Sequence, residues 1–255
     1  MYTDKIREIL RSGGVENFQQ ESRWIVAETA GESAAVAAAQ RRAAGEPLQY
    51  ILGTAEFRYL TLDVDRRVLI PRPETESLVE WVLKCAPQNA AVLDLGCGSG
   101  AIALSLAHER CDLRVTAADY SVDALDVAKH NAEKCKLSGK VEFVHTDLFS
   151  NLTGRKFDII AANLPYVTEA EYGLLDAEVR DFEPFMALVA PDEGLQLIFR
   201  TIAQLDEFLT PGGAAIFELS PPQADITASE LQKHGFKSHI ELDLCGRKRF
   251  VCGER

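Results

Sequence analysis

Hydrophobic and polar positions divide the chain into a helical N-terminal part and a longer part in which apolar strands alternate with helical stretches. Residues 3–45 carry apolar positions at helical spacing and predict a small bundle of helices. Residues 51–69 are rich in aromatic and β-branched residues and predict a β-hairpin. Apolar strands are then expected at residues 90–95, 112–118, 140–146, 157–162, 212–218, 237–243 and 248–252.

The alternation of strands and helices predicts a doubly wound α/β sheet with helices on both faces. We expect three parts: a helical bundle in residues 1–50, a β-hairpin and linker in residues 51–75, and an α/β domain in residues 76–255. Ligands of such sheets bind beyond the carboxyl ends of the strands. Candidate functional residues are therefore sought where strands end.

Composition fits a globular cytoplasmic protein. The 255 residues are 47% hydrophobic and 26% charged, enough for a full core. No apolar run approaches the roughly 18–20 residues of a membrane span, and the first residues lack a signal pattern, so we expect no membrane contact. The six cysteines are dispersed, without a Cys-x-x-Cys pair or histidines at metal spacing, so we expect reduced thiols and no metal. We also expect a monomer.

A glycine-rich turn follows the strand at residues 90–95. Gly96, Gly98 and Gly100 can adopt positive φ, and the helix that begins there presents free N–H groups to a ligand. The glycine spacing also matches a dinucleotide fingerprint, with Asp119 about where the ribose ligand is expected. Taken alone, the turn leaves both NAD and S-adenosylmethionine open as cofactors.

Two features favour S-adenosylmethionine over NAD, the carboxylate of Asp94 and the loop Asn163-Leu-Pro-Tyr166. Asp94 precedes the first glycine and supplies a carboxylate for the cationic amino-acid part of that cofactor, a charge that a dinucleotide site does not need. A nicotinamide enzyme needs a proton donor, yet Tyr172 is followed four residues later by Asp176, and no Tyr-x-x-x-Lys pair occurs. We therefore expect S-adenosylmethionine with Asp119 at its ribose, although Asp119 also fits a cap of the helix that opens at Ser121.

The loop Asn163-Leu-Pro-Tyr166 follows the strand at residues 157–162 and indicates the substrate. The Asn163 side chain and the Leu164 main chain each offer a carbonyl oxygen, and Tyr166 offers a stacking face. These groups suit a planar NH₂ group, either an amide or an aromatic amine. The sequence therefore predicts an amino-group methyltransferase, with Asn163, Leu164, Pro165 and Tyr166 as catalytic and substrate-binding residues.

The distribution of charged residues helps to distinguish a protein substrate from a nucleic-acid substrate. Residues 1–76 hold 10 Lys and Arg against 12 Asp and Glu, and the remainder holds 17 against 27, which gives the net charge of −12. A phosphate backbone favours Lys and Arg, so an acidic α/β domain weakens the alternative of a nucleic-acid amino-methyltransferase acting on adenine. A non-catalytic cofactor-binding subunit is a third hypothesis, disfavoured by the intact Asn163–Tyr166 loop.

Over nearly its whole length the chain resembles the protein-(glutamine-N5) methyltransferases that modify peptide-chain release factors, the HemK/PrmC family. Besides the glycine turn and the Asn163 loop, the resemblance rests on the strings Gly45-Glu-Pro-Leu-Gln-Tyr-Ile-Leu-Gly53, Val68-Leu-Ile-Pro-Arg-Pro-Glu-Thr-Glu76, Phe182-Glu-Pro184 and Asp243-Leu-Cys-Gly-Arg-Lys-Arg-Phe250. The family usually has proline where this chain has Leu164. Because that position supplies a main-chain carbonyl, which leucine keeps, activity is expected to survive the change.

The resemblance implies a seven-stranded, Rossmann-like class I methyltransferase sheet and, as substrate, the glutamine of a Gly-Gly-Gln loop in a release factor held by the N-terminal bundle. It places Arg72 and Pro73 beside the methionine end of the cofactor and the substrate entrance, although Pro71-Arg-Pro73 also fits a rigid linker between domains. It places Asp147 and Leu148 at the adenine, although Asp147 also fits a turn and Leu148 an ordinary apolar wall. Tyr120 fits either an adenine contact or packing at a strand end. The expected cofactor-binding residues are Asp94, Gly96, Cys97, Gly98, Ser99, Gly100, Asp119, Tyr120, Asp147, Leu148 and Asn163.

Overall fold

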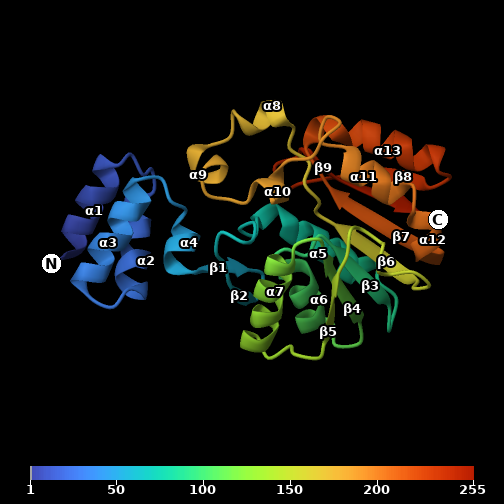
Figure 1. Cartoon of the computed structure of the whole chain (residues 1–255), viewed down its shortest axis with the longest axis horizontal. Helices are drawn as coiled ribbons and strands as arrows, with labels where there is room; N and C mark the ends of the chain where they lie inside the picture. The colour runs from blue at the N-terminus through green and yellow to red at the C-terminus, as the bar shows by residue number, and fades with distance from the viewer. Residues whose placement is uncertain (1) are drawn as a thin grey trace.

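The computed structural model describes residues 2–255 and shows a bundle of helices at one end of the long axis and an α/β domain at the other (Figure 1). The bundle consists of α1 (Tyr2–Ser12), α2 (Phe18–Glu28), α3 (Glu32–Ala43) and the short α4 (Leu48–Leu52). Its own small core contains the fully buried Ile6, Leu10 and Ile25. The bundle buries the apolar side chains whose helical spacing predicted it.

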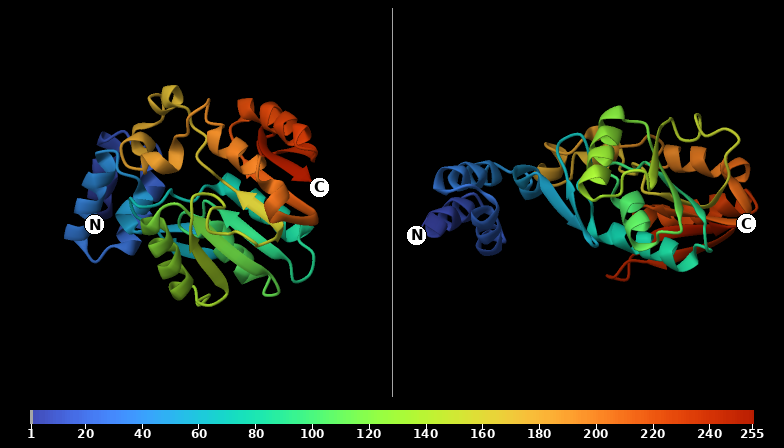
Figure 2. Two further views of the ribbon diagram at one scale, coloured as in Figure 1. Left: turned by 45° about the vertical axis from the view of Figure 1, so that its right-hand side comes forward. Right: turned by 90° about the horizontal axis from the view of Figure 1, so that it is seen from below.

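A β-hairpin joins the bundle to the α/β domain, as Figure 2 shows from below. Its strands are β1 (Thr54–Phe57) and β2 (Leu60–Asp63), shorter than the predicted hairpin of residues 51–69. Asn131 holds the hairpin on the α/β domain, because its carboxamide accepts a hydrogen bond from the Asp63 N–H (2.7 Å) and donates one to the Asp63 carbonyl (2.9 Å). Phe57 and Leu62 complete the anchorage by burial in the main core.

The seven-stranded sheet has the order β5-β4-β3-β6-β7-β9-β8. The five strands β5, β4, β3, β6 and β7 are parallel, and β9 runs antiparallel between β7 and β8. The predicted seven-stranded, doubly wound sheet is therefore confirmed. The strands are β3 (Ala91–Leu95), β4 (Arg114–Asp119), β5 (Val141–His145), β6 (Phe157–Ala162), β7 (Leu209–Glu218), β8 (Lys237–Leu242) and β9 (Lys248–Glu254).

Helices cover both faces of the sheet because neighbouring strand residues point to opposite sides. Val92 enters one core with α5 (Glu76–Cys85), α6 (Ala101–Glu109) and α7 (Val122–Lys134). Leu93 enters the other core, whose helices are α11 (Gln196–Ile202), α12 (Leu205–Phe208) and α13 (Ala224–Lys233). Since both faces are buried, the strands read as apolar runs rather than as alternating patterns.

Three short helices lie between β6 and α11 and form the segment of residues 169–188. They are α8 (Glu169–Tyr172), α9 (Ala177–Arg180) and α10 (Phe185–Leu188). A parallel bridge between Val167 and Val189 closes the ends of the segment. In Figure 1 the segment extends from the sheet toward the bundle, with α9 nearest to it.

Two 3₁₀ turns, η1 (Pro73–Thr75) and η2 (Pro221–Gln223), precede α5 and α13. Across residues 2–255 no helix is long and apolar enough to cross a membrane.

Candidate active site

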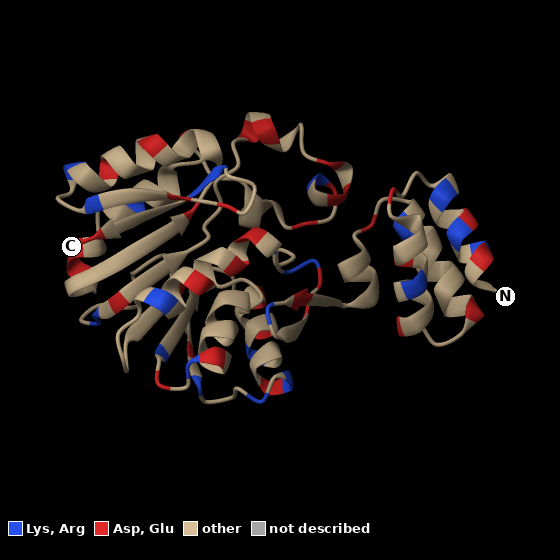
Figure 3. Cartoon of the chain, turned by 180° about the vertical axis from the view of Figure 1, so that it is seen from behind, with Lys and Arg blue, Asp and Glu red and all other residues tan. Residues whose placement is uncertain are grey.

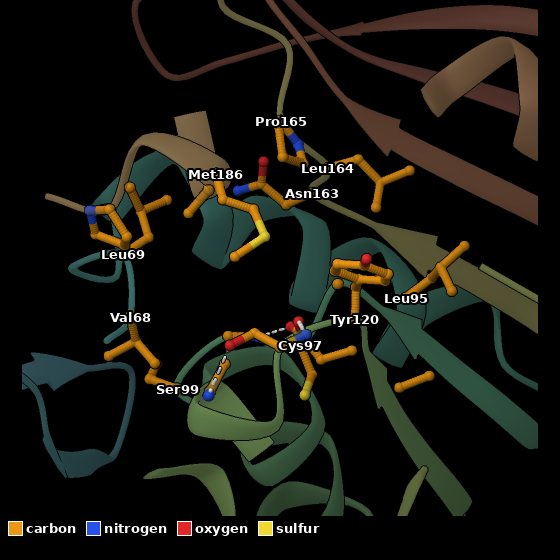
Figure 4. A pocket seen from close by; sticks show the side chains of 18 of the residues that line it. Val68, Leu69, Leu95, Cys97, Ser99, Tyr120, Asn163, Leu164, Pro165 and Met186 are labelled. Atoms are coloured by element: carbon orange, nitrogen blue, oxygen red, sulfur yellow. Dashed lines mark hydrogen bonds between the residues drawn. The ribbon is translucent and has the colours of Figure 1, made fainter. Parts of the chain in front are cut away.

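A cavity of about 590 Å³ lies at the carboxyl ends of β3, β4 and β6. In Figure 4 Asn163 and Pro165 stand on one side of it beside Met186, while Cys97 and Ser99 face them from the glycine turn. Twelve residues predicted from the sequence line this cavity. They are Arg72, Gly96, Cys97, Gly98, Ser99, Asp119, Tyr120, Asp147, Leu148, Asn163, Leu164 and Pro165.

The glycine turn is held open by backbone geometry that only glycine adopts without strain. Gly96 and Gly98 have φ of 81° and 53°. The N–H groups of Gly96 and Cys97 both donate to the Ala118 carbonyl, at 2.8 and 3.0 Å, so β4 fixes the turn. A Cβ on Gly96 would lie 3.0 Å from a methyl group of Leu164, so the glycine turn and the Asn163 loop are in close contact.

Asp119 ties the turn to the start of α7. Its two carboxylate oxygens accept hydrogen bonds from the N–H groups of Gly98 and Ser121, both at 2.8 Å. Burial raises the pKa of this carboxyl, and the two N–H donors oppose the rise. Ser121 itself caps α7 by accepting from Ala124 N–H. Each Asp119 oxygen keeps a lone pair for a further hydrogen bond, and its contact with a ribose stays a prediction.

Asp94 and Gly100 lie behind the turn and do not line the cavity. Asp94 is fully buried, and its Oδ2 accepts from the Ala103 N–H at 3.0 Å near the start of α6. Burial raises the pKa of Asp94 to about 7. Gly100, with φ of 84°, precedes α6 where a Cβ would crowd Leu104 and Ala128. The contact of Asp94 with a cofactor stays a prediction.

Asp147 and Leu148 line the cavity beyond β5, and Tyr120 lines it beyond β4. Asp147 pairs with Arg200 of α11 at 3.0 Å, and Leu148 is buried with a positive φ of 48°. Tyr120 is largely exposed, and its carbonyl contacts the His145 ring at 2.9 Å. These side chains line the cavity beyond the carboxyl ends of β4 and β5.

Asn163 is fixed at the end of β6. Its Nδ2 donates to the Thr75 hydroxyl at 3.1 Å. Leu164 is buried and packs into the second core, so its side chain stabilises the loop. The donor side of the Asn163 carboxamide is thus engaged within the protein, which leaves its carbonyl oxygen for a ligand.

Tyr166 does not line the cavity. Its ring packs against the second core, its hydroxyl lies 3.4 Å from Arg249, and its carbonyl accepts from Gln223 Nε2 at 2.8 Å. Burial raises the pKa of Tyr166 to about 12. This arrangement supports the loop from behind, so the stacking role expected for Tyr166 stays a prediction.

Arg72 lines the cavity and pairs with the buried Glu183 at 2.5 Å. Glu183 also accepts a hydrogen bond from the Ile70 N–H at 3.2 Å, which joins the linker to the segment of residues 169–188. Pro73 begins η1 and does not line the cavity, whereas Pro71 does.

Several lining residues were not singled out from the sequence. Thr75 lies within the string Val68–Glu76, but no neighbouring residue in the sequence indicated a role for its hydroxyl. Met186 and Arg200 belong to segments that are remote in sequence from the motifs. No cluster of three or more metal-ligating side chains occurs within residues 2–255. The further lining residues include Val68, Leu69, Thr75, Phe185, Met186, Leu197 and Arg200.

Comparison with known proteins places this site in a family. The model of the Methyltransferase small domain matches residues 74–179. A release factor glutamine methyltransferase of Geobacter sulfurreducens is 37% identical over 251 residues, which cover 91% of this chain and 88% of that protein. One from Koribacter versatilis is 42% identical over 84% of this chain and 77% of its own length.

Solved structures support the fold alone, because their sequences are distant. The hMettl16 catalytic domain superposes with a TM-score of 0.64 at 17% identity and covers 88% of this chain and 79% of its own. A methyltransferase from Pyrococcus furiosus gives a TM-score of 0.59 at 16% identity, over 76% of this chain and 88% of that one. On the identity and coverage of the curated relatives, this chain belongs to the release factor glutamine methyltransferase family.

Proposed function

We propose that this protein transfers a methyl group from S-adenosylmethionine to the side-chain amide nitrogen, N5, of the glutamine in the Gly-Gly-Gln motif of a release factor. One observation carries the proposal. The carboxamide nitrogen of Asn163 donates a hydrogen bond to the Thr75 hydroxyl. The carbonyl oxygen of Asn163 is therefore free to face the cavity that the glycine turn also lines. An acceptor in this place suits an NH₂ group beside a methyl donor.

The residues of the cavity fit the cofactor. Gly96, Gly98 and Ser99 would hold its amino-acid part, Asp119 its ribose hydroxyls, and Tyr120 and Leu148 its adenine. The cavity of about 590 Å³ has room for a molecule of this size. When bound, S-adenosylmethionine supplies a methyl group on a sulfonium, which is already electrophilic.

The substrate amide is the weaker reactant, because its nitrogen lone pair is delocalised into the carbonyl. If the Asn163 side chain and the Leu164 carbonyl accept its two N–H groups, the nitrogen is held in line with the methyl group. Placement of this kind contributes roughly 7–11 kcal/mol in favourable cases. The same acceptors stabilise the positive charge that develops on nitrogen. Proton loss follows methyl transfer and needs no specialised base.

Exposed apolar side chains at the rim suit a protein substrate. Phe185 and Met186 line the cavity and are each about half exposed, at 51% and 56%. The helical bundle, residues 1–50, would add a second contact with the release factor. We further propose that the enzyme acts as a monomer in the cytoplasm, where release factors work.

Nucleic acid is not the favoured substrate. Figure 3 shows acidic and basic positions interspersed along the helices of the bundle and the α/β domain, and the net charge is −12. The names of the curated relatives specify glutamine.

The test uses labelled S-adenosylmethionine with a purified release factor, the variant of that factor whose Gly-Gly-Gln glutamine is alanine, and total RNA. Label on the wild-type factor that disappears from the variant supports the proposal. Label on RNA alone assigns the enzyme to base modification instead.

The substitution Asn163→Ala tests the loop. We expect turnover to fall by about 100-fold or more, since an acceptor aimed at developing charge is lost. Cofactor affinity, measured by calorimetry, should change much less. Turnover equal to that of the wild type would remove Asn163 from the mechanism.

A further inference from the structure

The side chain of Gln223 lies behind the Asn163 loop and joins it to a neighbouring turn. Gln223 is 4% exposed, and its Nε2 donates to the carbonyl oxygens of Tyr166 at 2.8 Å and Glu193 at 2.9 Å. Its Oε1 accepts from the Ser220 N–H at 3.1 Å. One buried carboxamide therefore connects the end of the Asn163 loop, the turn that precedes α11 and the residue before η2.

The partners of this carboxamide fix its orientation. Tyr166 and Glu193 present carbonyl oxygens, which only accept hydrogen bonds, and Ser220 presents an N–H group, which only donates. A carboxamide turned by half a rotation would place its oxygen against two carbonyl oxygens and its NH₂ group against an N–H group. Gln223 therefore has one favourable orientation, in which both of its N–H groups and its oxygen are engaged.

The turn beside Tyr166 leaves no room for a side chain at Gly194. This glycine is buried with φ of 74°, and a Cβ on it would lie 1.9 Å from the Tyr166 carbonyl oxygen and 2.5 Å from Gln223 Nε2. Asp192 and Glu193 also have positive φ, of 53° and 55°, a conformation that residues other than glycine seldom adopt. Such backbone persists where its surroundings hold it, and the hydrogen bond from Gln223 to Glu193 contributes to that.

The Asn163 loop is thereby held at both ends. At its start, Ala162 pairs with β3 and β7 in the sheet, and at its end Tyr166 is held by Gln223. Between them Pro165 has no N–H group, and its ring fixes its own φ. A shift of the Tyr166 main chain is therefore expected to reach the Leu164 carbonyl, two residues earlier, with little local adjustment.

We propose that Gln223 is a positioning residue for methyl transfer. Packed beside Gly194, it holds the Tyr166 carbonyl and thereby sets the direction of the two acceptors, on Asn163 and Leu164, that face the substrate amide. The proposal rests on the proposed function, since it assumes that these two groups accept hydrogen bonds from the substrate. Gln223 does not line the cavity, so it acts through the loop.

The substitution Gln223→Met tests the hydrogen bonds, because methionine has a similar length but no N–H groups. We expect kcat to fall about 10- to 100-fold, the scale of a small misplacement of reacting groups. The dissociation constant of the cofactor, measured by calorimetry, should change little. The matched control is Gln232→Met, since the Gln232 side chain donates to the Ser238 hydroxyl at 2.9 Å on an exposed face. Wild-type kcat in Gln223→Met would overturn the proposal.

The substitution Gly194→Ala displaces the same carbonyl without changing Gln223, so it also serves if Gln223→Met does not fold in urea-unfolding experiments. Its methyl group would overlap the Tyr166 carbonyl, and we expect kcat to fall. Gly154→Ala is the control: Gly154 has φ of 79° but no atom within 4 Å of an added Cβ, so it tests backbone strain alone. This control should retain wild-type kcat.

The double variant Gln223→Met, Gly194→Ala tests whether the two residues act through one group. If both act through the Tyr166 carbonyl, the double variant should lose less than the product of the two single losses. Losses that multiply would show two independent effects and would contradict the shared route.

A spectroscopic readout is independent of turnover. The chain has only five asparagines, so selective ¹⁵N labelling, with Asn163→Ala for assignment, resolves the Asn163 side-chain NH₂ signal. That signal should move in Gln223→Met and Gly194→Ala but not in Gln232→Met. A signal unmoved in the first two variants overturns the proposal. If the wild type methylates no release-factor glutamine, the proposed function fails instead, and the Asn163 signal still reports whether Gln223 positions the loop.

Discussion

Asp119 performs two tasks with one side chain. It accepts from the N–H groups of Gly98 and Ser121, so it stabilises both the glycine turn and the approach to α7. The same carboxylate faces the cavity where the ribose of the cofactor is proposed to bind. We therefore expect the loss of this group to affect both folding and cofactor binding.

We expect Asp119→Ala to lower the free energy of unfolding by about 1–3 kcal/mol, because two buried N–H groups lose their acceptor. Cofactor affinity should fall by about tenfold or more, equivalent to at least about 1.4 kcal/mol. Urea unfolding and calorimetry measure the two effects. Asp123→Ala, at an exposed position on α7, is the control and should change neither strongly. Unaltered cofactor affinity in Asp119→Ala would exclude the ribose contact.

Residues of the cavity were predictable where a strand ends in a motif. Gly96 and Asn163 follow β3 and β6, Asp119 is the last residue of β4, and all three line the cavity. Thr75 and Arg200 were not predicted, because their place beside the motifs depends on tertiary packing. Tyr166 shows the converse: the motif marks the residue, but packing against the second core decides where its ring lies.

At the scale of elements, the segment of residues 169–188 is fastened on two sides. Arg42 of α3 pairs with Glu21 of α2 at 2.7 Å and with Glu178 of α9 at 2.5 Å. On the other side Glu183 pairs with Arg72 of the linker at 2.5 Å. A guanidinium group on α3 therefore links the bundle to the segment of residues 169–188.

Arg42→Ala should destabilise the protein by about 1–3 kcal/mol, because it leaves the largely buried Glu21 without its partner. Amide exchange in α9 should also become faster, since Glu178 loses its tie to the bundle. The control is Lys5→Ala, which removes an exposed ion pair with Glu32 and should cost less than about 1 kcal/mol. Exchange in α9 that stays at the wild-type rate would show that the pair does not restrain the segment.

Strands that form a continuous apolar run were predictable from the sequence, whereas the shortest helices were not. The strands at 90–95 and 157–162 agree with β3 and β6 to within one residue. β7 begins at Leu209 rather than residue 212, because its pairing with β6 continues past an irregularity that the sequence hides within a Thr-Pro-Gly-Gly string. Helices α8, α9 and α10 have four residues each, too few to show a helical period.

For the whole molecule, buried carboxyl groups set part of the response to pH. Asp94 and Glu218 are both buried at the active-site edge of the sheet, and both have pKa values raised to about 7. Unfolding returns such a group to a lower pKa, so between about pH 4 and 7 the folded state holds a proton that the unfolded state has lost. Their contribution to stability is therefore present at low pH and is lost as pH rises toward 7.

Asp94→Asn should remove the part of this dependence that belongs to Asp94. Relative to the wild type, the variant should gain stability as pH rises from 4 to 7, by an amount on the order of a few kcal/mol, and the difference should level off above pH 7. Urea unfolding without cofactor at several pH values measures it. Asp126→Asn, at an exposed site, should show no such trend. Parallel stability curves for Asp94→Asn and the wild type would contradict the raised pKa.

The described chain starts in the bundle and finishes beside β9, so its two ends lie at opposite extremes of the long axis (Figure 1). Energy transfer between fluorescent dyes attached at these ends would report the distance along the long axis of the molecule. Energy transfer between them depends on how the bundle is angled to the sheet and is insensitive to motions inside the cavity. We expect docking of a release factor on the bundle to change this energy transfer, whereas cofactor binding inside the cavity should leave it unchanged.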